Sequence, residues 1–408
     1  MEQIQGGVTS ATGFEAASIA AGIKYQNRTD MALIYSTAPC EAAGTFTSNV
    51  VKAAPVIWDR SIVRESDEKV QAVVINSGIA NACTGKEGLR ICEETAEAAG
   101  EALGIPMRSV LVGSTGVIGM QLPMDRIKAG IAELAAAKAG TREAGEAASR
   151  AIMTTDTVNK EVCVTLELGG KTVTIGGMAK GSGMIHPGMC TMLAYVTTDA
   201  AITKELLQKA VSAVVEDTFN MISVDGDMST NDTLLVLANG LARNALIDCE
   251  NEDYEAFQET LHFICRTLAM KMAGDGEGAT RLIESQVCHA DTKEHARILA
   301  KAVIQSNLTK AAVFGRDANW GRVLCALGYS GAPFDPENVD LYFEAEGRSM
   351  LIFTHGSAAD YSEQEAAQLL GCDKVIIRSD MHMGEEAATA WGCDLTYDYV
   401  KINADYRS

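Results

Sequence analysis

The junction between Cys190 and Thr191 holds the residue whose type and setting best fit a chemical role. The run MAKGSGMIHPGMCTMLAYVTTD at 178–199 begins as a glycine-rich loop and ends as an apolar, strand-like segment. Glycines allow strained backbone geometry, whereas the segment behind them is typical of a stiff strand. A hydroxyl held there could attack the preceding peptide carbonyl, and cleavage would place a free amine beside the Thr191 Oγ. A threonine activated by its own terminal amine is a recognised nucleophile.

Two other interpretations of this junction remain open on the residues alone. Most threonines at strand starts only fit a half-buried pleat. Cys190 and His186 could also form a thiolate–imidazole pair, but they lie four residues apart on one loop, whereas such pairs usually meet through the fold. Cys190 is therefore better interpreted as a small residue at the scissile position.

Short strands must position the other loops that could do chemistry. Ala72–Ile75 predicts a buried strand that leads into the loop NSG, and Ser109–Val112 predicts a second that leads into GSTG at 113–116. Cys92–Leu103 is rich in Ala and Glu and predicts a helix, and another helix is expected to begin at Pro123. Alternation in 162–175 around Gly169-Gly170 predicts a β-hairpin that feeds the glycine loop.

The second half of the chain predicts the same mixture of elements. Helices are expected around 206–214, 257–268 and 293–304, strands at 279–287, 375–377 and 395–400, and a hairpin around Gly347. Helices and strands in mixed order, with hairpins, favour an α+β fold of mixed α/β layers over a doubly wound one. The chain has neither GxGxxG after a first strand nor GxxxxGK[ST], so no nucleotide cofactor is indicated.

Composition narrows the class of protein further. A net charge of −20 over 408 residues argues against a nucleic-acid partner or an anionic membrane surface. The eleven cysteines include no CxxC pair, and there is no His-rich ligand cluster, so we predict reduced thiols and no metal. The N-terminal residues lack the pattern of a signal peptide, and no apolar run approaches a membrane span, which predicts a cytoplasmic protein.

The motifs together resemble those of the ornithine acetyltransferase family, also called glutamate N-acetyltransferase, of arginine biosynthesis. The segment KGSGMIHPGMCTML resembles the family's cleavage site. The resemblance continues through GGVTSATGF, NSGIANACTG, GSTGVIG, MTTDT, SVDGDMSTNDT, GDGEGATR, GRDANWGR and the terminal INADYRS. It therefore spans nearly the whole chain in the family's order.

The resemblance implies a self-cleaving threonine-nucleophile fold, cut between Cys190 and Thr191. The fragments 1–190 (α) and 191–408 (β) would share one core and associate as an α2β2 heterotetramer. They would not be independent domains, because the hairpin before the cut and the strand after it are expected to share a sheet. The implied reaction moves an acetyl group from N2-acetylornithine to glutamate by a ping-pong route through acetyl-Thr191. No cofactor is implied, and members differ in whether acetyl-CoA also serves as donor.

The family's functional residues carry over to positions of the same type in this chain. Thr115 and Gly116 match the oxyanion hole, although an STG turn alone would be ordinary. Substrate contacts map to Thr154, Lys180, Thr191, Glu277, Asn403 and Ser408. A carboxylate can be bound by Lys180 and the Thr154 hydroxyl, and Glu277 can supply an anion to the distal ammonium of ornithine. Without the resemblance, Lys180 and Glu277 would be interpreted as solvated loop charges.

The chain differs from the family's usual residues at three positions, and two other functions remain open. Cys190 stands where alanine is usual, Ile79 where asparagine is usual, and Ser408 where threonine is frequent. One rival is an aminopeptidase or amide hydrolase that uses the same nucleophile with water. The other is a ligand-binding protein that never cleaves.

Overall fold

The computed structural model describes residues 1–186 and 192–405. These residues form two compact units. The first comprises Met1–Gly181, 192–216 and Met228–Leu268, and the second comprises 182–186, Asp217–Asp227 and 269–405. The predicted Cys190, Thr191 and Ser408 lie outside the described residues.

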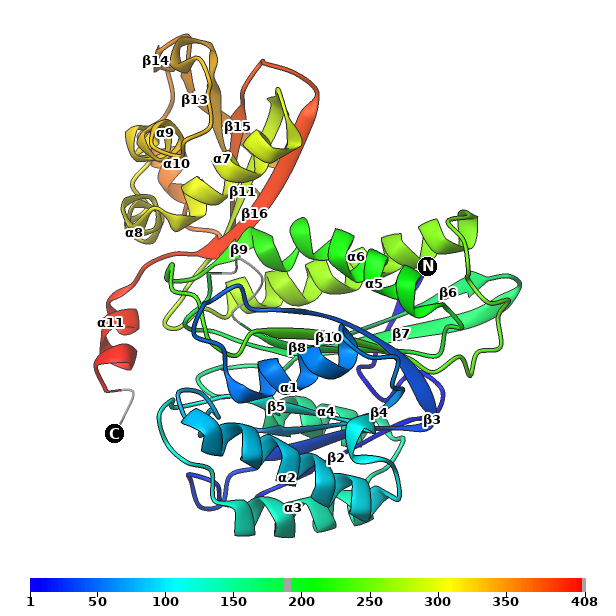
Figure 1. Cartoon of the computed structure of the whole chain (residues 1–408). Coiled ribbons are helices and arrows are strands. Elements are labelled where there is room, and N and C mark those ends of the chain that lie inside the picture. The colour runs from blue at the N-terminus through cyan, green and yellow to red at the C-terminus, as the bar shows by residue number, and fades with distance from the viewer. Residues whose placement is uncertain (187–191, 406–408) are drawn as a thin grey trace. The chain divides into compact units, whose positions relative to one another are not determined.

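The first unit is built on one long sheet (Figure 1). In the described residues its order is β1-β6-β7-β8-β10-β3-β4-β5, with β2 paired to β3. The strands are β1 (Glu2–Ile4), β2 (Phe14–Ile19), β3 (Met31–Phe46), β4 (Val70–Asn76), β5 (Val110–Ser114), β6 (Lys160–Leu168), β7 (Lys171–Lys180), β8 (Leu193–Thr198) and β10 (Thr233–Ala238). The fully buried β8 and β10 are parallel, as expected for strands covered on both faces.

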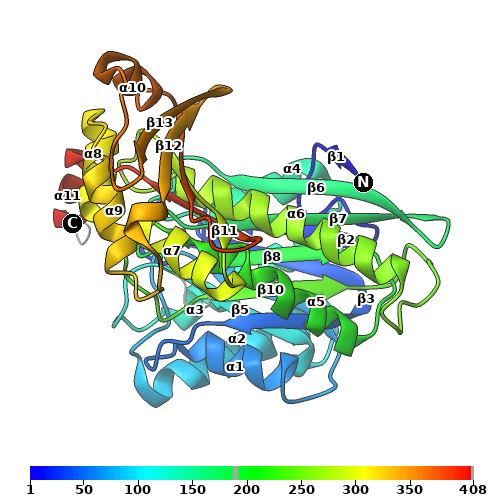
Figure 2. The same cartoon turned by 90° about the horizontal axis from the view of Figure 1, so that it is seen from above.

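Helices cover this sheet. α5 (Lys204–Glu216) and α6 (Glu252–Gly274) lie side by side over β8 and β10 (Figures 1 and 2). The others are α1 (Ala54–Val63), α2 (Gly85–Leu103), α3 (Met124–Ala137) and α4 (Arg142–Ala151), with a 3₁₀ turn at Met107–Ser109. They bury β3, β4 and β5 in a core that also takes in Met178, Leu193 and Tyr195. The two strands that flank the predicted cut therefore belong to one hydrophobic core.

The second unit holds its own sheet, ordered β14-β13-β12-β15-β11-β16-β9 in the described residues. Its strands are β9 (Ile222–Ser223), β11 (Leu282–Ala290), β12 (Asp340–Ala345), β13 (Arg348–Thr354), β14 (Ser357–Ala358), β15 (Lys374–Asp380) and β16 (Glu386–Cys393). Its helices are α7 (Lys293–Gln305), which packs on β11 and β16, α8 (Asn307–Gly315), α9 (Trp320–Gly328), α10 (Glu363–Leu369) and α11 (Tyr397–Ala404), with 3₁₀ turns at Phe219–Met221 and Pro336–Asn338.

The predicted mixed α/β class is confirmed, as is the shared sheet. β7 pairs antiparallel with β8 from Ile175↔Thr198 to Lys180↔Leu193. None of the helices in the described residues is both long and apolar enough to cross a membrane.

One expected strand is wrong. The sequence predicts an extended segment at Leu395–Val400, but from Tyr397 onward the chain forms the helix α11. The Tyr and Val residues of this segment favour a strand, but two side-chain hydrogen bonds favour the helix. Thr396 donates its hydroxyl to the Gly278 carbonyl at 2.7 Å, just before the helix begins. Asn403 donates to the Tyr399 carbonyl at 3.0 Å, one turn back along it.

Candidate active site

The loop that carries Thr115 and Gly116 is fixed by the neighbouring loop after β4. The Thr115 N–H donates to the Asn76 carbonyl at 3.0 Å, and the Val117 N–H donates to the Gly78 carbonyl at 3.1 Å. Gly116 has a φ of +131°, and a β-carbon there would overlap the Gly78 carbonyl. This close approach of two backbones requires glycine.

Two donors in this loop remain available. Within the described residues, neither the Gly116 N–H nor the Thr115 hydroxyl has a hydrogen-bond acceptor. Both residues are half-buried. Two consecutive residues of the loop therefore each supply a donor, a hydroxyl and a backbone N–H, which are groups that can form an oxyanion hole.

Ile79, where the family usually has asparagine, holds this loop through its backbone carbonyl. Its carbonyl accepts from the Asn76 amide at 2.7 Å and from the Ser114 hydroxyl at 3.2 Å. Its side chain is buried in the core. The loop is therefore held through the backbone of position 79, which an isoleucine supplies as well as an asparagine.

Asn231 and Thr233 connect this loop to the start of β8. The Asn231 amide donates to the Ser114 carbonyl at 2.8 Å. Thr233 donates its hydroxyl to the Asn231 carbonyl at 3.0 Å and its N–H to the Met192 carbonyl at 2.9 Å. The residue that follows the predicted nucleophile is thus tied to the predicted oxyanion loop through three hydrogen bonds.

Lys180 and Thr154, predicted to bind one carboxylate, lie together. The Lys180 ammonium donates to the Thr154 hydroxyl at 2.8 Å. Lys180 is the last residue of β7 and pairs with Leu193, so it lies at the edge where β8 begins. Its side chain is only 10% exposed, so it is not the solvated loop charge that its sequence context alone would suggest.

Asp156 supports this pair and was not predicted as a site residue. Its carboxylate accepts from the buried Lys160 ammonium at 2.7 Å and from the Gly181 N–H at 2.7 Å. Lys180 lies 3.9 Å from its other oxygen. Burial alone would raise the pKa of Asp156, but the charges of Lys180 and Lys160 and these hydrogen bonds lower it to about 2. The Lys180 ammonium therefore lies beside the Thr154 hydroxyl, and these are donor groups that suit an anionic ligand.

In the second unit, Glu277 and Asn403, both predicted to contact substrate, lie in contact with each other. The Asn403 amide donates to Glu277 Oε2 at 2.7 Å, and the Glu277 N–H donates to the Ser182 carbonyl at 2.8 Å. A β-carbon on Gly183 would collide with the Glu277 carboxylate. Glu277 is 6% exposed, and in the described part of this unit no lysine, arginine or histidine pairs with it. A buried carboxylate of this kind is a suitable partner for a cationic ligand.

Asp225, also missed, fixes the loop before the predicted cut. It accepts from the N–H groups of Met184 and Ile185 at 2.6 and 2.8 Å and from the Tyr399 hydroxyl at 3.2 Å. Tyr399 lies one turn before Asn403 on α11. Asp225 and Asp156 both stand in the matched motifs SVDGDMSTNDT and MTTDT, and that was the available signal.

His186, the partner in the cysteine alternative, contacts the Ser223 hydroxyl at 3.2 Å. Burial, followed by the Lys301 charge, lowers its pKa to about 4. This histidine is therefore neutral near pH 7.

These features fit one class of protein, the acetyltransferases that the motifs resemble. The chain belongs to the ArgJ family, whose model matches residues 15–408. It is similar to the "arginine biosynthesis bifunctional protein ArgJ" of Symbiobacterium thermophilum, at 54% identity with 100% of both chains covered. It is also similar to "ArgJ 1" of Clostridium acetobutylicum, at 50% identity over 98% of this chain and 97% of that one.

A solved structure of a relative adds a structural likeness. The crystal structure of arginine biosynthesis bifunctional protein ArgJ from Bacillus halodurans matches with a TM-score of 0.50 and 44% identity. The match covers 97% of that chain but 52% of this one. The solved chain therefore corresponds to about half of this chain.

Proposed function

We propose that this protein transfers the acetyl group of N2-acetyl-L-ornithine to L-glutamate, giving L-ornithine and N-acetyl-L-glutamate in arginine biosynthesis. The observation that carries the proposal is the family match over residues 15–408. The grouping of Lys180 with Thr154, and of Glu277 with Asn403, supports it. The pair in the first unit suits a carboxylate, and the pair in the second unit suits an ammonium; acetylornithine carries both groups.

Self-cleavage between Cys190 and Thr191 is part of the proposal. A solved relative whose chain matches only 52% of this one supports it, since a single fragment would have about that length. The pairing of β7 with β8 explains why the fragments 1–190 and 191–408 would stay associated: the cut would fall between two hydrogen-bonded strands of one sheet. Assembly of these fragments as an α2β2 heterotetramer in the cytoplasm completes the proposal.

The chemistry needs only groups of the chain. The Thr191 Oγ attacks the acetyl carbonyl while its proton passes to the Thr191 amine, whose ordinary pKa of about 8 leaves part of it neutral. Thr115 and Gly116 donate to the oxyanion, and its collapse releases ornithine, which takes up the proton. The amine of glutamate then attacks the acetyl-Thr191 ester. Ser408 contributes to the substrate pocket, and no cofactor takes part.

Acetyl transfer is tested by incubating the purified chain with acetylornithine, with and without glutamate. Glutamate-dependent release of ornithine is expected, and equal release without glutamate would favour the hydrolase. A denaturing gel that shows only full-length chain would favour the ligand-binding protein. Acetyl-CoA belongs in the same assay as a second donor, because relatives are named bifunctional.

Thr115→Val should lower kcat by about 10²–10³-fold, because one oxyanion donor is lost while the side-chain shape is kept. The same loss should slow self-cleavage, since the carbonyl of residue 190 passes through a similar intermediate. Thr115→Ser is the matched control and should retain most activity. Steady-state kinetics on fully cleaved enzyme measure the effect, and equal rates for the valine and serine variants would remove Thr115 from the oxyanion hole.

Glu277→Gln should weaken recognition of ornithine's distal ammonium. A charge-assisted hydrogen bond of about 1.5–3 kcal/mol would be lost, which is roughly a tenfold to hundredfold loss in kcat/KM for acetylornithine. Asn403 can still bond the glutamine, so the local fold should persist. N-acetylglutamate lacks that ammonium and, as donor in the exchange reaction, should lose less. Equal losses on both donors would assign Glu277 to the chemistry or the fold.

A further inference from the structure

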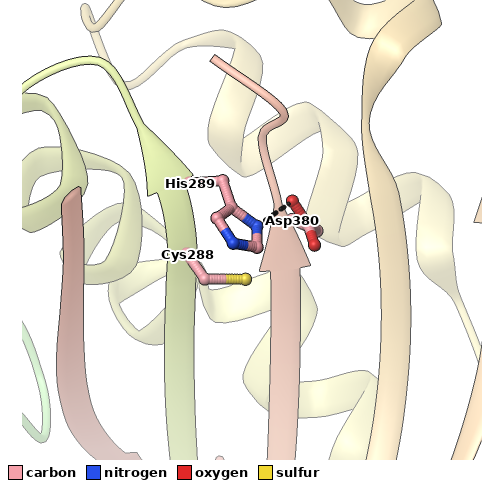
Figure 3. A group of neighbouring side chains, drawn as sticks. All are labelled: Cys288, His289 and Asp380. Atoms are coloured by element: carbon pink, nitrogen blue, oxygen red, sulfur yellow. Dashed lines mark hydrogen bonds and ion pairs between the residues drawn. The ribbon is translucent and has the colours of Figure 1, made fainter. Parts of the chain in front are cut away.

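Consecutive residues Cys288 and His289 point toward the same carboxylate at the end of β11 (Figure 3). Neighbours on a regular strand point to opposite faces. Here the register between β11 and β16 shifts between Val287 and Ala290, and His289 has a φ of +54°. A break in the register of this kind changes the direction in which side chains point. The positive φ costs conformational energy because His289 is not a glycine. The carboxylate is Asp380, the residue of β15 that pairs with Cys288.

The three side chains form a compact donor set. His289 Nδ1 lies 2.8 Å from Asp380 Oδ1. One ligand atom from each of Cys288, His289 and Asp380 lies within 4.8 Å of the others. Zinc with nitrogen and oxygen ligands at about 2.0–2.1 Å and sulfur at about 2.3 Å needs separations of roughly 3.3–3.6 Å. Small side-chain rotations would therefore bring the three ligand atoms to the separations that zinc needs.

His382 and Asp340 orient the carboxylate of this set. His382 Nδ1 lies 3.3 Å from Asp380 Oδ1, and its Nε2 lies 2.9 Å from Asp340 Oδ2. Its ring stacks on that of His289 at 6.4 Å between centroids. Carboxylates that ligate metals are themselves usually hydrogen-bonded, and His382 can supply such a bond to Asp380.

Charge and access also suit a cation. The side chains of His289 and His382 are 55% and 41% exposed, so an ion can reach the set from solvent. Arg378 lies beside Cys288, but its charge is balanced by Glu344 at 2.8 Å. Burial raises the pKa of the Cys288 thiol, so metal binding would have to displace its proton.

We propose that Cys288, His289 and Asp380 bind a divalent transition-metal ion of borderline softness, such as Zn²⁺, with solvent as the fourth ligand. One sulfur, one nitrogen and one oxygen favour such an ion over Ca²⁺ or Mg²⁺, which take oxygen ligands. Binding releases the thiol proton to solvent, and His289 ligates as a neutral imidazole. The ion joins the ends of β11 and β15. Sequence spacing does not reveal the set, because Asp380 lies 91 positions from His289.

The test uses the full chain after removal of metals with a chelator. Titration with Co²⁺ should give one tetrahedral spectrum per chain with a thiolate-to-cobalt band. Zn²⁺ should displace the Co²⁺, and competition with a chromophoric chelator gives its affinity. Cys288→Ser, His289→Asn and Asp380→Asn should each weaken Zn²⁺ binding by about tenfold or more, and Cys288→Ser should abolish the thiolate band.

Matched controls exist in the same unit. His295 forms a comparable pair with Asp291 at 2.8 Å, and Cys325 is an exposed free cysteine. His295→Asn and Cys325→Ser should bind Zn²⁺ as the parent does. Circular dichroism confirms that each variant is folded. Absence of stoichiometric binding, or a thiolate band that persists in Cys288→Ser, overturns the proposal.

Discussion

Thr191→Ala is expected to leave the chain uncut and without acetyl-transfer activity. One hydroxyl serves both steps in the proposed mechanism, first against the carbonyl of Cys190 and then against the acetyl carbonyl of the donor. The expectation rests on the position of Thr191 at the end of the glycine loop, directly before Met192 and β8. Intact mass spectrometry measures the cut, and ornithine release measures the transfer. A variant that is both cut and active contradicts the assignment of Thr191.

Two neighbouring variants separate threonine from cysteine chemistry. Thr191→Ser keeps a hydroxyl and should still cleave at an altered rate. Cys190→Ala should be nearly silent in both assays, since alanine is usual at this position in the family. Cleavage that survives in Cys190→Ala while transfer is lost would instead favour Cys190 with His186.

The sequence predicted the first sheet well because its strands carry local signals. The β6–β7 hairpin follows from alternating apolar residues around Gly169-Gly170, and the structure pairs Leu168 with Lys171. The strands before the NSG and GSTG loops are continuous apolar runs, and they form β4 and β5. Periodicity and turn residues suffice where each element is specified by its own residues.

Tertiary contacts decided what the sequence did not reveal. Helix α11 contains no buried residue, so it has no apolar stripe to predict it. Apart from the matched motif MTTDT, no local pattern marks Asp156 as a site residue, because its partner Lys180 comes from the end of β7. The pairing of Glu277 with Asn403 joins positions 126 residues apart, and only the family resemblance linked them beforehand.

Asp156→Asn is expected to destabilise the protein by about 3–5 kcal/mol, the usual result of removing one partner of a buried ion pair. Lys160 is fully buried and its ammonium bonds to Asp156 at 2.7 Å, so the variant removes the negative charge from a buried ion pair. Chemical denaturation measures the free energy of unfolding. Asp199→Asn is the matched control, because Asp199 is also buried but accepts from the backbone N–H groups of Thr12 and Thr174. It should lose only about 1–3 kcal/mol.

Acid should remove part of the same stabilisation in the parent protein. The pKa of Asp156 is lowered to about 2 in the folded state, from an ordinary value of 3.8. Its contribution to stability is therefore complete above pH 3.8 and is lost as the pH falls through 2. Stability of Asp156→Asn should consequently depend less on pH over this range. Combining it with Lys160→Met removes the other charge of the pair and should restore part of the lost free energy. Strictly additive losses in the double variant would mean that the two charges do not stabilise one another.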